Sequence, residues 1–116
     1  MTTTPNLSDN CGYLFLAQHF NIPYRIPLLL ADRLEALWSG CSTTPQQQQA
    51  WKEANQLLNR KSLHRLMDGI AWLIERFKKI KTGEIDYATT NTHDLEGVIA
   101  GGPITVAKSP GYDVGA

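Results

Sequence analysis

The stretch that decides the fold is LHRLMDGIAWLIERFKKI, residues 63–80. Its apolar residues recur at spacings of three and four, which is the period of one face of an α-helix. Gly69 lies inside this stretch, where it costs about 1 kcal/mol relative to alanine, so we expect a close contact with another helix there. The stretch predicts one long amphipathic helix that ends at Gly83. Its apolar members are Leu63, Leu66, Met67, Ile70, Leu73, Ile74, Phe77 and Ile80.

Helix start and stop residues upstream of this stretch predict shorter helices. A polar cap at residues 8–10 begins the first, which runs to Phe20. Pro27 suits the first position of the second helix, and Gly40 supplies its C-terminal stop. The first helix is expected to bury four apolar residues, namely Leu14, Phe15, Ala17 and Phe20.

The clearest helix start in the chain is Thr44-Pro45-Gln46-Gln47. Thr44 and Gln47 have the spacing of a capping box, and Pro45 opens the helix. The apolar phase slips between this helix and the long one, which predicts a bend or short break at residues 59–62. We therefore expect an all-α fold, a bundle of about four helices over a head domain of residues 1–82. Its expected core includes Leu30, Leu34, Leu37, Trp38, Trp51, Leu58, Leu66, Ile70, Leu73 and Phe77.

Residues 83–116 differ from the head domain in composition and charge. They hold six glycines and two prolines, show no helical period, and carry one lysine against five carboxylates. The head domain carries ten Lys and Arg against six Asp and Glu, so a formal net charge of zero joins a basic head to an acidic tail. The sequence predicts an extended C-terminal arm that binds partner surfaces. Its expected partner-binding residues are Ile85, Tyr87, Ile104, Val106, Tyr112 and Val114.

The sequence offers no defensible site for chemistry. His19, His64 and His93 are scattered, and Cys11 and Cys41 are too far apart for a zinc pattern. We expect no catalytic residues, no metal and no cofactor, and a protein that is not an enzyme. The basic residues of the long helix suit a solvated helix face, a partial nucleic-acid footprint, or attraction to acidic tails of neighbouring subunits. The expected electrostatic contacts are Arg76, Lys78, Lys79 and Lys81.

One resemblance concerns the end of the long helix. The segment 74–85, IERFKKIKTGEI, ends an amphipathic helix on a glycine turn, and a Gly/Pro-containing tail follows it. This is similar to the C-terminal region of tailed-phage head–tail joining proteins, the neck adaptors of the Mu and HK97 type. The resemblance covers about a third of the chain and implies a homo-oligomeric ring, located in the virion and made in the host cytoplasm. It implies portal and tail proteins as partners, no membrane, and DNA only as a molecule that passes through the channel.

A second resemblance concerns Gly101-Gly102. The preceding residues, DLEGVIA, look like the double-glycine leader end of ribosomally made, modified peptides, with Ile99 at a suitable distance. Leu95 is one position off the usual leucine. This alternative implies a precursor that is cleaved after Gly102, with residues 103–116 as the core peptide. A small interaction domain unrelated to either family remains a third interpretation.

Overall fold

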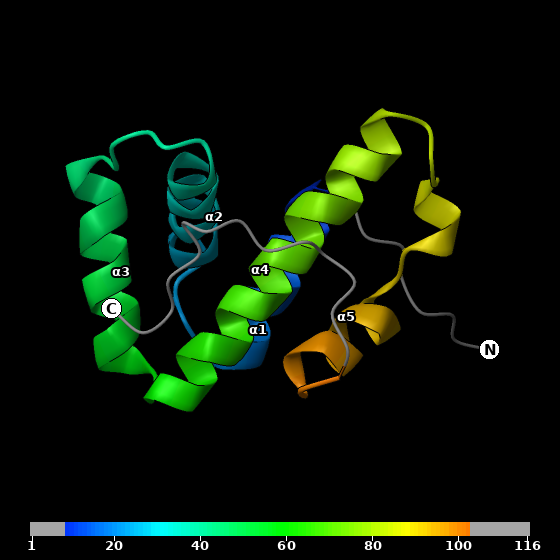
Figure 1. Ribbon diagram of the computed structural model, residues 1–116. Helices are drawn as coiled ribbons and strands as arrows, with labels where there is room; N and C mark the ends of the chain where they lie inside the picture. The colour runs from blue at the N-terminus through cyan, green and yellow to red at the C-terminus, as the bar shows by residue number, and fades with distance from the viewer. Residues whose placement is uncertain (1–8, 103–116) are drawn as a thin grey trace.

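The computed structural model describes residues 9–102 and shows an all-helical fold, as the sequence predicts (Figure 1). Five α-helices and one short 3₁₀ helix make up this part of the chain. Their bounds are α1 Asp9–Phe20, α2 Arg25–Trp38, α3 Pro45–Leu57, α4 Arg60–Lys81, η1 Tyr87–Thr89 and α5 Thr92–Ile99.

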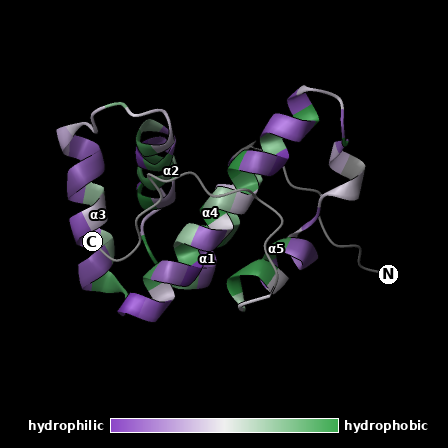
Figure 2. Ribbon diagram, viewed as in Figure 1, coloured by the Kyte–Doolittle hydropathy of each residue, from purple (hydrophilic) through white to green (hydrophobic). Residues whose placement is uncertain are grey.

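The long helix α4 is the centre of the bundle. It packs against all four other α-helices, while α2 and α3 also pack side by side as a pair (Figure 1). Every residue from Leu66 to Ile74 is buried, so this part of α4 is covered on all sides. Figure 2 shows the consequence along α4, whose hydrophilic residues gather toward its two ends. The polar surface that α4 offers is therefore concentrated at its two ends.

The predicted start signals act where the sequence places them. The Thr44 hydroxyl accepts from the Gln47 backbone N–H at 3.2 Å, and the Gln47 side chain accepts from the Thr44 N–H at 2.8 Å. This confirms the capping box of α3. The chain breaks at Leu58, and the Asn59 side chain caps α4 by accepting from the Ser62 N–H at 2.8 Å. The break thus lies at the start of the expected range 59–62.

Four helices end in the same hydrogen-bonded turn. At the end of α4, Gly83 N–H donates to the Ile80 carbonyl and Glu84 N–H to the Lys79 carbonyl, at 3.1 and 2.9 Å. This is the Schellman motif, which needs a left-handed residue after the helix, and Gly83 supplies it with φ +79°. The predicted stops at Gly40 and Gly83 are confirmed. The left-handed residues are Asn21, Gly40, Gly83 and Gly101.

Gly69 lies where α1 and α5 both approach α4. A Cβ at this position would stand 2.7 Å from Ile99 Cγ2 and 3.0 Å from Leu16 Cδ2. The expected close helix contact is therefore confirmed. Gly12 on α1 makes a similar approach, because a Cβ there would lie 2.6 Å from Leu73 Cδ2. Only glycine lets the helix backbones come this close without moving a neighbour.

Several expectations about individual residues need correction. Pro27 is the third residue of α2 rather than the first, since the helix begins at Arg25. Its missing N–H does no harm there, because the first-turn N–H groups have no partner within a helix. Leu14 is 43% exposed, and Leu16, which the sequence analysis left out, takes its place in the core. The apolar residues 13–17 run without interruption, so spacing alone did not distinguish the two faces. Three expected core residues are only partly buried, namely Leu37, Trp38 and Leu58.

The expectation that the chain is extended after Gly83 is wrong for residues 87–99. They form η1 and α5, and α5 packs on α4 with Leu95, Val98 and Ile99 buried in the common core. Asn91 caps α5 by accepting from the N–H groups of His93 and Asp94. The predicted arm can therefore begin only after Gly102, and residues 103–116 lie outside the described part of the chain.

Candidate interaction surfaces

The two described residues of the predicted partner-binding set lie at the corner after α4. Ile85 is half-buried, and the Tyr87 side chain is 44% exposed on η1. Local hydrogen bonds hold this corner: Asp86 caps η1 by accepting from the Thr89 N–H at 3.2 Å, and the Gly83 turn fixes the end of α4. Tyr87 is thus displayed on an ordered support. The other four members of the set, Ile104, Val106, Tyr112 and Val114, lie outside the described residues.

The basic residues at the C-terminal end of α4 do not share one face. The Arg76 guanidinium lies over the Trp72 ring at 4.9 Å, on the side that α5 covers. The Lys78 ammonium lies over the Trp38 ring at 5.7 Å, on the side of α2. Cations in the last turn of a helix also favour its negative dipole end, so these side chains have a structural role.

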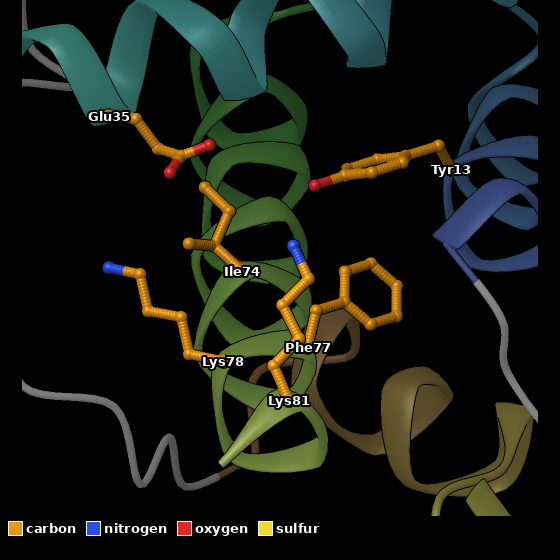
Figure 3. Close-up of a pocket in the computed structure, with 6 residues that line it drawn as sticks. All are labelled: Tyr13, Glu35, Ile74, Phe77, Lys78 and Lys81. Atoms are coloured by element: carbon orange, nitrogen blue, oxygen red, sulfur yellow. The ribbon is translucent and has the colours of Figure 1, made fainter.

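A small hollow opens beside this end of α4, between α1 and α2 (Figure 3). Its volume is about 170 Å³, and its lining combines a phenol, a carboxylate and two ammonium groups with two apolar side chains. The Tyr13 hydroxyl, the Glu35 carboxylate and the Lys81 ammonium point into it in Figure 3, whereas the Lys78 ammonium points away. Opposite charges face the same small space, so the hollow has no preference for a cation or an anion.

The opposite end of α4 carries a different surface. Arg60, Lys61, His64 and Arg65 line a hollow of about 460 Å³, and no carboxylate lines it. We call these four residues the N-end basic cluster. The sequence analysis grouped three of them with the basic residues of the C-terminal end. The structure separates the two groups by about 20 Å along α4, at 1.5 Å per residue. The signal that distinguishes this cluster is the absence of Asp and Glu from residues 54–67.

Within residues 9–102, the structure brings no three His, Cys, Asp or Glu side chains together in the manner of a metal site. His19 stacks beside Phe15 and Phe20 on α1, while His64 and His93 lie on α4 and α5. No helix in this part of the chain is long and apolar enough to span a bilayer.

Comparison with known proteins yields no match to a family model, to a curated protein or to a solved structure.

Proposed function

We propose that this protein is a structural virion component, the ring-forming head-to-tail adaptor of a tailed phage. In this role each subunit docks on the portal, and its C-terminal residues contact the portal and neighbouring subunits. The observation that carries the proposal is the Ile85–Tyr87 corner, which presents an exposed aromatic residue directly after the helix end that resembles the neck adaptors.

Tyr87 has the properties of an interface anchor. A tyrosine combines a large apolar ring with a hydroxyl that can form a hydrogen bond, and it has few torsions to immobilise on binding. Because the capped η1 helix and the Gly83 turn hold the corner, binding needs little further ordering of the backbone here. Ile85 adds apolar area next to it.

A ring follows naturally from one contact of this kind. When a patch on one subunit binds a different patch on the next, the contact is heterologous, and it closes into a ring if the rotation allows. A small helical subunit with one displayed corner and a further segment after Gly102 has two separate regions for such contacts.

The precursor-peptide alternative receives less support. Leu95 is 0% exposed and Ile99 is 5% exposed, so a processing protease would have to unwind α5 to read them. Gly101 also has a conformational reason to be glycine. It is the left-handed residue of the turn that ends α5, and a Cβ there would stand 2.9 Å from the Arg65 guanidinium carbon.

The proposal is tested by assembly of the full chain with the portal protein encoded beside it. Electron microscopy and sedimentation should show rings on the portal for the natural chain. The variant Tyr87→Ser should assemble at least about tenfold more weakly, the loss of one interface anchor. Leu57→Ser removes a side chain that is 51% exposed at the far end of α3, and it should assemble normally.

A chain that stays monomeric both alone and with the portal would overturn the adaptor proposal. Equal losses for Tyr87→Ser and Leu57→Ser would overturn the assignment of the corner. The intact mass of the protein in purified particles separates the two resemblances. An uncut chain supports the adaptor, whereas a released 103–116 fragment would support the precursor.

A further inference from the structure

The N-end basic cluster is a concentrated positive surface. Positions 60, 61, 64 and 65 lie within two turns on one side of α4. The side chains of Arg60, Lys61 and His64 are exposed, and that of Arg65 is half-buried. Together they line one hollow, which is open to solvent at this end of the bundle.

No acidic residue balances this cluster. The nearest carboxylates along the chain are Glu53 and Asp68. Glu53 accepts both of its close contacts from Arg25, and Asp68 is only 5% exposed. At the other end of α4, by contrast, Glu35 shares the hollow with its two lysines. The positive charge at the N-end of α4 is therefore local and uncompensated.

Helix electrostatics give no reason to place these cations here. The N-terminus of a helix is its positive end, so Arg60 and Lys61 in the first turn are repelled by the helix dipole. The first turn of α4 contains no acidic residue to offset this. A cluster of cations held against the local field favours an anion supplied from outside the molecule.

We propose that the N-end basic cluster binds the phosphate backbone of double-stranded DNA. Guanidinium forks match the geometry of phosphate oxygens, and a duplex presents one negative charge per about 1.7 Å of its axis. No Phe, Tyr or Trp lines the hollow, so it lacks the stacking platform with which proteins hold single-stranded bases. The contact reads no base sequence. It goes beyond the adaptor role, and it stands or fails separately because its test needs no assembly partner.

The test is the binding of the full chain to a labelled duplex of about 20 base pairs and mixed sequence, followed by fluorescence anisotropy from about 50 to 200 mM salt. The double variant Arg60→Gln/Lys61→Gln removes two exposed cations of the cluster. Its matched control, Lys78→Gln/Lys81→Gln, removes two exposed cations from the other end of α4 and changes the net charge equally.

We expect the natural chain and the control to bind duplexes of unrelated sequence with similar affinity. The Arg60→Gln/Lys61→Gln variant should bind at least about tenfold more weakly at low salt, and its slope of log affinity against log salt should fall by about 1.8. Absence of binding at low salt, or equal losses for the two double variants, would overturn the proposal. Tighter binding to single-stranded RNA or to anionic lipid vesicles than to the duplex would also overturn it.

Discussion

Gly69 and Gly97 both lie inside helices, yet their surroundings are opposite. A Cβ at Gly69 would meet the branched side chain of Ile99 at 2.7 Å, in the packed layer between α1, α4 and α5. A Cβ at Gly97 would meet nothing within 4 Å. The first glycine is therefore required by packing, while the second only adds chain entropy to the unfolded state.

We predict opposite effects of alanine at these two positions. Gly69→Ala should lower the free energy of unfolding by about 1–3 kcal/mol, because overpacking outweighs the gain of about 1 kcal/mol in helix propensity. Gly97→Ala should raise it by about 0.5–1 kcal/mol. Chemical denaturation of the two variants beside the natural chain measures both changes. A Gly69→Ala variant that gains stability would show that the helices separate at no cost.

At the scale of the element, the junction of α3 and α4 depends on one side-chain cap. Asn59 satisfies the Ser62 N–H, so Asn59→Ala should lower the free energy of unfolding by about 0.5–2 kcal/mol. Asn55 is an exposed asparagine within α3, and Asn55→Ala should leave stability unchanged or slightly increased. Thermal melting of the two variants compares the same chemical change inside and before a helix. Equal losses would show that the cap contributes nothing.

The N-end basic cluster leads to a prediction about stability that opposes its effect on binding. Neutralising Arg60 and Lys61 removes two cations from the positive end of α4, which should stabilise the fold by about 0.3–1 kcal/mol for each residue. The same change at Lys78 and Lys81 should destabilise it, because those residues favour the negative end. Denaturation at low and high salt tests this, since salt should shrink both differences. A loss of stability on neutralising Arg60 and Lys61 would mean that the cluster serves the fold.

The elements that the sequence predicts well are those whose signals are local. The capping box of α3, the glycine stops of α2 and α4 and the long stripe of α4 each lie within a few consecutive residues. The helix α5 also has such signals, since Asn91 precedes it, Leu95, Val98 and Ile99 have helical spacing, and Gly101 ends it. The glycine content around this short helix outweighed them. Whether α5 forms depends on the groove at Gly69, which is a contact between distant residues.

The candidate surfaces follow the same division. The excess of basic residues is visible in the sequence, but its separation into two ends appears only when α4 is placed in the bundle. Burial of Leu66–Ile74 removes the middle of α4 from the surface, and α5 covers the side near Arg76. The exposure of Tyr87 likewise depends on the short η1 helix, which the sequence did not predict.

At the scale of the whole molecule, the bundle closes only with α5. Leu95, Val98 and Ile99 belong to the same core as α1–α4, and Leu16 and Ile99 approach Gly69 from neighbouring helices. Within residues 9–102, every member of this core lies at or before Ile99. The folding unit should therefore reach Gly102, and a chain that ends at Thr82 lacks one side of its core.

We predict that a chain of residues 1–102 unfolds cooperatively, whereas a chain of residues 1–82 does not. Burial of one large apolar side chain contributes about 1.5–3 kcal/mol, so losing three removes roughly 5–9 kcal/mol, close to the whole stability of a small domain, about 5–15 kcal/mol. Thermal melts followed by circular dichroism should show a sharp transition for 1–102 and a broad, early one for 1–82. If 1–82 melts as sharply as 1–102, α5 is an appendage, and the boundary after residue 82 that the composition suggests is a boundary in the fold as well.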